Sequence, residues 1–297
     1  MSEPSNQSLD FAVIGAQKCA TSWMYYCLKD HPQICVPTKK REVAYLGGAL
    51  AKENGVDWFF DRFQCSDNQV RGDVSVVYLY DADSAEVLKA HMPQPKLIVS
   101  LRNPVDRFVS SYYWLCRSGI LPDQEINTWI NSLPDSSWST KLGDDAAQVI
   151  LRGFYADQLK GYLNCFSPKS FLILLYEDIQ ECPMEAIQRV YRFLNIDDEF
   201  VPPNLAAKPK QNSYNRWLLY IERKFKSKLT SHVVNLAHQF LSRGSRKSAP
   251  ISQQSRDKLC SIFSVQTQEL ISLLGSFPEN QRPSTDDIRA RWEIASK

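Results

Sequence analysis

The feature that most constrains the fold is a short apolar run that leads directly into small and hydroxyl-bearing residues. The run Phe11-Ala-Val-Ile-Gly15 is typical of a buried strand, and a helical pattern begins a few residues later. At such a turn, backbone N–H groups point outward without partners and the helix dipole adds partial positive charge. The segment therefore predicts an anion-binding turn, formed by Gly15, Ala16, Gln17, Lys18, Cys19, Ala20, Thr21, Ser22 and Trp23.

The spacing within this turn distinguishes between phosphate ligands. A loop that binds nucleoside triphosphates has the pattern GxxxxGK[ST], in which lysine directly precedes the hydroxyl that binds magnesium. Here Lys18 follows Gly15 by only three residues and the second glycine is absent. Two further residues separate the lysine from Thr21. Triphosphate binding is therefore disfavoured, while an ordinary strand-to-helix turn with a solvated lysine stays open as an alternative.

A second buried strand ends in an arginine that adds to this pattern. Residues 96–101 are mostly apolar, Arg102 follows them, and Pro104 begins a helical pattern that contains Ser110. The guanidinium can bind a phosphate through two parallel hydrogen bonds, and the serine hydroxyl can add a third donor. Arg102 and Ser110 are therefore predicted to bind a second phosphate at the same sheet edge as Lys18. A helix-end salt bridge is the alternative for Arg102 alone.

Taken together, these segments resemble the 5′-phosphosulfate loop and the 3′-phosphate motif of sulfotransferases, in particular the group that contains heparan-sulfate and related bacterial enzymes. The resemblance extends from roughly residue 10 to 215. It implies a P-loop-like sulfotransferase fold and the donor 3′-phosphoadenosine 5′-phosphosulfate (PAPS), with 3′-phosphoadenosine 5′-phosphate (PAP) as product. It also implies metal-independent transfer of a sulfuryl group to a hydroxyl or amine of a glycan, a glycolipid or a small-molecule natural product.

The same resemblance assigns roles to further residues. Residues 39–46 resemble the family's Lys-Glu-Val-His-Phe-Phe segment, in which Glu42 falls on the proposed catalytic glutamate. Residues 72–79 resemble Gly-Glu-Lys-Ser-Pro-x-Tyr-Phe, and Asp73 is the reserve base. Lys18 is expected to stabilise the leaving group. The remaining residues expected at the donor site, from a Gly-x-Tyr-x-x-x-Leu helix and a late loop that closes over the donor, are Tyr155, Lys208, Lys210 and Asn212.

Two positions depart from the members of the family that bind glycans. Ala44 stands where the heparan enzymes have histidine, and Val74 replaces a lysine. These departures argue against a heparan-like acceptor, and the sequence leaves the acceptor unidentified. A nucleoside or sugar kinase and a catalytically silent nucleotide-binding protein stay open as alternatives, and an ATP- and magnesium-dependent activity would identify the kinase.

The order of elements indicates an α/β fold. Strands are predicted near 11–14, 34–36, 96–101 and 171–176, and they alternate with helices near 20–29, 83–91, 104–117, 146–164 and 183–194. Such alternation predicts a central parallel sheet with helices on both faces. The single ordered run of motifs favours one domain over residues 1–297. Within it we expect a flexible segment over 1–9, a lid or acceptor wall over 118–145, and a helical part over 216–297.

The cysteines and the N-terminal residues indicate the cellular compartment of the protein. The eight cysteines include no CxxC pair and no zinc-type spacing, so reduced thiols of a cytoplasmic protein are expected. No signal peptide is visible, and no apolar run reaches the roughly eighteen residues of a membrane span.

The basic residues are concentrated in one part of the chain. The net charge of the chain is +2, and residues 208–228 contain seven basic residues and only one acidic residue. This tract is a candidate contact for a nucleotide, an acidic lipid surface or an acidic glycan. No nucleic-acid partner is expected, and the oligomeric state stays open.

Overall fold

The computed structural model describes residues 7–37, 49–81, 83–118, 120–121, 124–134, 144–206 and 250–292, which form two compact units. The first unit comprises Met1–Asn103, Phe154–Pro209 and Gln266–Lys297, and the second comprises Pro104–Gly153 and Lys210–Val265. Among the described residues, no helix is long and apolar enough to cross a bilayer.

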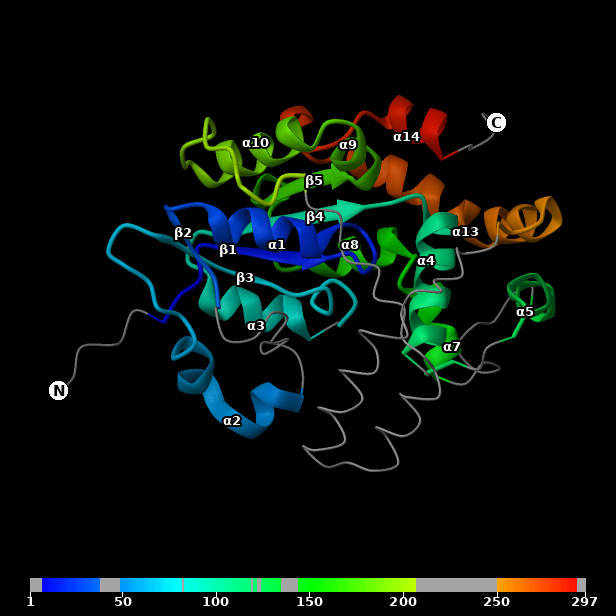
Figure 1. Cartoon of the computed structure of the whole chain (residues 1–297), viewed down its shortest axis with the longest axis horizontal. Helices are drawn as coiled ribbons and strands as arrows, with labels where there is room; N and C mark the ends of the chain where they lie inside the picture. Colours follow the sequence, from blue (N-terminus) through cyan, green and yellow to red (C-terminus); the bar gives the residue numbers. More distant parts are fainter. Residues whose placement is uncertain are drawn as a thin grey trace. The chain divides into compact units, whose positions relative to one another are not determined.

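A five-stranded sheet forms the centre of the first unit (Figure 1). Its strands lie in the order β2-β3-β1-β4-β5, and every pairing among the described strands is parallel. Because the chain first builds on one side of β1 and then crosses to β4 on the other side, the strand order reverses beside β1. Ligands of such sheets bind at this switch point, outside the carboxyl ends of the strands. The strands are β1 (Phe11–Gly15), β2 (Ile34–Cys35), β3 (Val70–Val74), β4 (Lys96–Leu101) and β5 (Phe171–Leu175).

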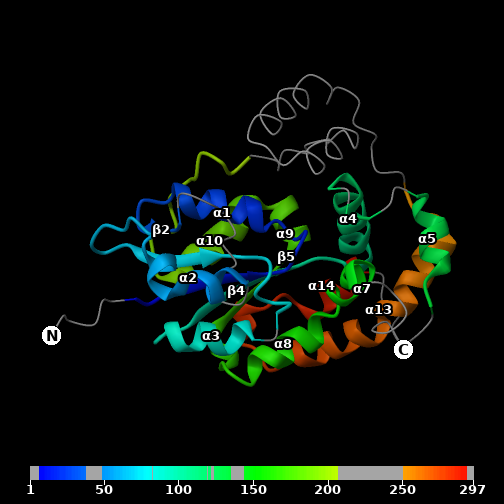
Figure 2. The ribbon, with the colours of Figure 1, turned by 90° about the horizontal axis from the view of Figure 1, so that it is seen from below.

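Helices cover both faces of this sheet, which confirms the predicted α/β architecture. One face packs against α1 (Thr21–Asp30), α9 (Tyr176–Glu181) and α10 (Pro183–Leu194). The other face packs against α2 (Ala49–Phe60), α3 (Ser84–His91), α8 (Tyr155–Leu163), the end of α13 (Gln253–Leu274) and α14 (Thr285–Arg291). Figure 2 shows α1 and α10 on one side of the strands and α3 and α8 on the other. Two short 3₁₀ helices, η2 (Pro168–Ser170) and η3 (Glu279–Gln281), complete this unit.

The strand β3 and the helix α2 are elements that the sequence pattern did not predict. β3 has the sequence VRGDV, whose glycine and charged residues weaken a strand pattern. Its Gly72 packs under the ring of Phe11 in β1, where a Cβ atom would lie only 2.1 Å from the ring. Gly72 therefore weakens the strand pattern in the sequence, yet its lack of a side chain is what allows β3 to pair with β1. The predicted helix over 146–164 is two helices, α7 (Asp144–Leu151) and α8.

The described part of the second unit is helical. It contains α4 (Pro104–Arg117), α5 (Ile126–Ser132), α7 and the first part of α13. Trp129 of α5 stacks on Phe108 and Tyr112 of α4, with ring centroids 5.5 and 4.8 Å apart. α5 lies inside the segment 118–145, so that segment is not wholly irregular; its role as a lid or acceptor wall stays a prediction.

The prediction of reduced cysteines is wrong for one pair. Cys35 in β2 and Cys65, in the segment before β3, form a disulfide, with their Cα atoms 5.4 Å apart. Thirty residues separate the two cysteines, and only the pairing of β2 with β3 brings them together. The expectation that all eight cysteines are reduced is therefore corrected for Cys35 and Cys65. The other six cysteines are not in disulfides.

We expect Cys65→Ser to lower the free energy of unfolding by about 3 to 4 kcal/mol, because the disulfide constrains a long loop of the unfolded chain. Denaturant unfolding with and without a reductant measures this: the reductant should destabilise the wild-type protein but not the variant. Cys182→Ser removes an exposed thiol that is in no disulfide and should change stability by less than about 0.5 kcal/mol. Equal stability of the two variants would contradict a structural disulfide.

Candidate active site

The turn between β1 and α1 presents backbone N–H groups without acceptors at the switch point of the sheet. α1 has Ala20 at its N-cap and no side-chain cap, and its first hydrogen bond runs from the Met24 N–H to the Ala20 carbonyl (3.0 Å). In the part of the chain that the structure describes, no acceptor pairs with the backbone N–H groups of Thr21, Ser22 and Trp23. The helix dipole adds positive charge at the same place. A bound anion would supply the missing acceptors.

The backbone of this turn adopts conformations typical of ligand-binding loops. Lys18 and Ala20 both lie in the left-handed region, with φ of 71° and 65°. Left-handed residues interleaved with others direct successive N–H groups toward one point, and such conformations concentrate at ligand sites. The turn is attached to the sheet because the Ala16 N–H donates to the Ser100 carbonyl of β4 (2.8 Å). Gly15 is needed for close packing, since a Cβ atom there would lie 2.9 Å from Leu79 Cβ.

Arg102 lies beside this turn because β4 is the neighbour of β1. β4 ends at Leu101, which is paired with the last residue of β5, so Arg102 and Tyr176 leave the sheet next to each other. The Arg102 guanidinium lies over the Tyr176 ring, 4.2 Å from its centroid, and Nη1 donates to the Lys18 carbonyl (3.5 Å). The fold thus brings together two predicted site residues that are 84 residues apart.

Tyr155, at the start of α8, joins the turn to Arg102. Its hydroxyl donates to the Arg102 carbonyl (3.0 Å) and lies 3.8 Å from the Cys19 sulfur. The side chain is only 2% exposed. Through these contacts Tyr155 holds the turn against Arg102. The contact with the donor that the resemblance implies for Tyr155 stays a prediction.

Glu177 is a residue of this region that sequence reasoning did not select. It follows β5 in the first turn of α9, and its Oε1 accepts from the Asn103 N–H (3.0 Å). Burial raises the pKa of its carboxyl, while the Asn103 hydrogen bond and the positive charge of Arg102 act in the opposite direction. Glu177 therefore provides a half-buried counter-charge for Arg102. The signal in the sequence is an acid directly after the strand that pairs with β4.

The reserve base, Asp73, is enclosed in the protein. It lies in β3 beside Ala12 of β1 and is 1% exposed. The Tyr78 hydroxyl donates to its Oδ2 at 2.5 Å. Burial and this hydrogen bond favour a structural role for Asp73 over proton transfer from an acceptor molecule.

Several predicted site residues are not placed at this turn. Glu42, Lys208, Lys210 and Asn212 lie outside the described residues. Ser110 is half-buried on α4 of the second unit, and its pairing with Arg102 stays a prediction. Trp23 is 5% exposed and donates from its indole to the Leu205 carbonyl (3.0 Å), so it packs the chain after α10 against α1.

Known proteins show clear similarity to this chain. Residues 8–244 match the family of sulfotransferase domains. The membrane-associated sulfotransferase kil1 of Dictyostelium discoideum is 34% identical over 117 residues, which covers 37% of this chain and 24% of that protein. The bifunctional heparan sulfate N-deacetylase/N-sulfotransferase 1 of Caenorhabditis briggsae is 22% identical over 284 residues, or 91% of this chain and 30% of that protein. The chain thus spans less than a third of the length of these two relatives.

A solved structure shares the fold. The sulfotransferase from Alicyclobacillus acidocaldarius superposes with a TM-score of 0.68 at 19% sequence identity, over 99% of this chain and 100% of that one.

Proposed function

The chain belongs to the sulfotransferase domain family, and from this premise we propose that it transfers a sulfuryl group from PAPS to a hydroxyl or amine. The acceptor class is a glycan, a glycolipid or a small-molecule natural product. The observation that carries the proposal is the turn after β1, where Lys18 and the open N–H groups of α1 lie beside Arg102. Among the described residues, the first turn of α1 contains no aspartate or glutamate, which leaves its N–H groups open to an anionic donor.

The residues at the switch point fit a donor of this kind. Lys18, Thr21 and Ser22 would hold the 5′-phosphosulfate, since their N–H groups and side chains surround the start of α1. Arg102, held by Tyr176 and Tyr155, would bind the 3′-phosphate together with Ser110. Lys208, Lys210 and Asn212 would close over the donor. When bound, PAPS supplies the sulfuryl group and a leaving group that ends in the 5′-phosphate.

The chain contributes charge stabilisation and a base. Negative charge grows on the bridging oxygen as the acceptor attacks in line, and Lys18 stabilises it with help from Thr21, Ser22 and the N–H groups of the turn. Glu42 takes the proton that the acceptor hydroxyl or amine loses. Tyr155 holds the turn and Arg102 in position relative to each other, and the Glu177 carboxylate provides a negative charge near the Arg102 guanidinium.

The burial of Val74 in β3 supports a choice among the possible acceptors. Val74, which replaces the lysine of glycan-binding members, is 2% exposed and packs in the apolar core with Phe11 and Val13. It offers no charge for an anionic glycan, which supports an acceptor unlike heparan.

A cytoplasmic location stays a prediction, and the Cys35–Cys65 disulfide favours an oxidising compartment instead.

PAP is expected to stabilise the protein against heat far more than ATP or 5′-AMP, with no requirement for magnesium. At about 100 times its dissociation constant, a ligand adds about 2.7 kcal/mol of stability, and only PAP carries the 3′-phosphate that Arg102 would bind. Thermal shift measurements with each nucleotide, with and without magnesium, test this. Arg102→Ala should remove the preference for PAP over 5′-AMP. Equal stabilisation by ATP, or a need for magnesium, would overturn the PAPS assignment in favour of a kinase.

A further inference from the structure

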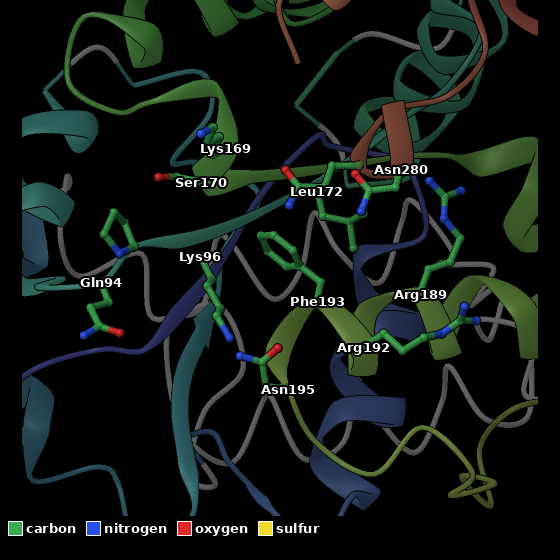
Figure 3. Close-up of a pocket in the computed structure, with 12 residues that line it drawn as sticks. Gln94, Lys96, Lys169, Ser170, Leu172, Arg189, Arg192, Phe193, Asn195 and Asn280 are labelled. Carbon is green, nitrogen blue, oxygen red and sulfur yellow. The ribbon is translucent and has the colours of Figure 1, made fainter. Parts of the chain in front are cut away.

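A basic cavity lies at the amino-terminal edge of the sheet, away from the candidate active site (Figure 3). Its volume is about 660 Å³, which is in the range of small-molecule sites. Four cationic side chains line it, and its described lining contains no aspartate or glutamate. These cations are Lys96, Lys169, Arg189 and Arg192.

The topology of the first unit assembles this cavity. Lys96 is the first residue of β4, and Lys169 lies in η2 just before β5, the strand paired with β4. Arg189 and Arg192 are three residues apart on α10, so they share one face of that helix. Arg102 follows the opposite end of β4, about 20 Å from Lys96 along the strand direction. A ligand in the cavity is therefore separate from the donor.

Neighbouring carboxylates neutralise these cations only in part. Arg192 pairs with Asp198 at 3.0 Å, but both side chains are largely exposed, and such pairs contribute less than about 1 kcal/mol. Arg189 lies 4.0 Å from Asp178, whose other oxygen is engaged by Arg291 at 2.7 Å. Lys96 and Lys169 form no ion pair with any described residue. Burial lowers the pKa of Lys96, against the attraction of Asp10, so its ammonium would gain from an anion.

The cavity also offers apolar surface. Phe193 is partly exposed, and in the view of Figure 3 its ring lies between Lys96 and the two arginines. A free sulfate or phosphate ion would use the cations and leave most of the volume and the apolar surface without contacts. We propose that the cavity binds an organic sulfate or phosphate ester, with its oxyanion held by the lysines and arginines and its carbon skeleton against the ring of Phe193.

Calorimetric titration at constant ionic strength tests this proposal with glucose 6-sulfate, inorganic sulfate and glucose. We expect glucose 6-sulfate to bind, inorganic sulfate to bind at least about tenfold more weakly, and glucose not to bind. The double variant Lys169→Gln/Arg192→Gln changes two exposed residues and should lower the affinity for glucose 6-sulfate at least about tenfold. The charge-matched control Lys29→Gln/Lys89→Gln removes two exposed lysines elsewhere in the first unit and should bind like the wild type.

A second variant separates the cavity from the donor site. Lys18→Ala/Arg102→Ala should keep the wild-type affinity for glucose 6-sulfate; loss of binding in this variant would mean that the probe occupies the donor site, and the proposal would be wrong. No binding of glucose 6-sulfate to the wild type, or equal affinity in the cavity double variant, would overturn it too. Equal affinity for inorganic sulfate would overturn the organic ester as ligand. Because binding is the readout, the result does not depend on whether the protein transfers sulfuryl groups.

Discussion

Lys18→Ala is expected to lower turnover by about 10²- to 10³-fold while the affinity for PAP changes much less. In the proposed reaction the lysine would meet a charge that grows as the bond to the leaving oxygen breaks, so its contribution would be larger in the transition state than in the bound ground state. Its backbone lies in the left-handed region, next to the open N–H groups of α1, which keeps it at the anion site. Steady-state kinetics and PAP titration on the same preparation measure both effects.

Two further variants make this result specific. Arg102→Ala should chiefly weaken PAP binding, because the proposed contact with the 3′-phosphate would be made both before and during the reaction. Lys29→Ala removes an exposed lysine in the last turn of α1 and should leave turnover and affinity unchanged. If Lys18→Ala retained nearly normal turnover, Lys18 would have no part in stabilising the leaving group.

Glu42→Gln is expected to reduce turnover at least about a hundredfold with little change in PAP affinity, because the amide keeps the shape of the side chain but cannot accept the proton. Asp73→Asn should act differently. Asp73 is 1% exposed and accepts a hydrogen bond from Tyr78, so its loss should lower stability and leave the activity per folded molecule largely intact.

Melting temperature, PAP affinity and turnover measured together distinguish the two carboxylates. The assignment of the base to Glu42 requires a folded, PAP-binding and inactive Glu42→Gln variant. An active Glu42→Gln protein together with a folded but inactive Asp73→Asn protein would move the base to Asp73.

Local sequence patterns determined the central strands and the anion-binding turn. β1, β4 and β5 are largely buried on both faces, so their sequences are mostly apolar runs that can be identified without knowledge of their partner strands. The turn after β1 is equally local, because its small residues, lysine and hydroxyls are contiguous and a helix start provides the open N–H groups. The spacing of these residues disfavours a triphosphate loop on the same local grounds, since it involves no contact between distant segments.

Contacts between distant segments of the chain determined the features that local sequence patterns do not predict: β3, the disulfide, the partner of Arg102 and the basic cavity. β3 is a strand because Gly72 fits under Phe11, and no property of VRGDV alone indicates this. The Cys35–Cys65 disulfide depends on the pairing of β2 with β3, and the half-buried Glu177 becomes the counter-charge of Arg102 only because β5 lies beside β4. The basic cavity likewise combines a strand start, a 3₁₀ turn and a helix face. A local sequence pattern shows how apolar and polar side chains alternate along one segment. Which distant residues come into contact depends instead on the order of the strands, and that order is determined only when the sheet packs.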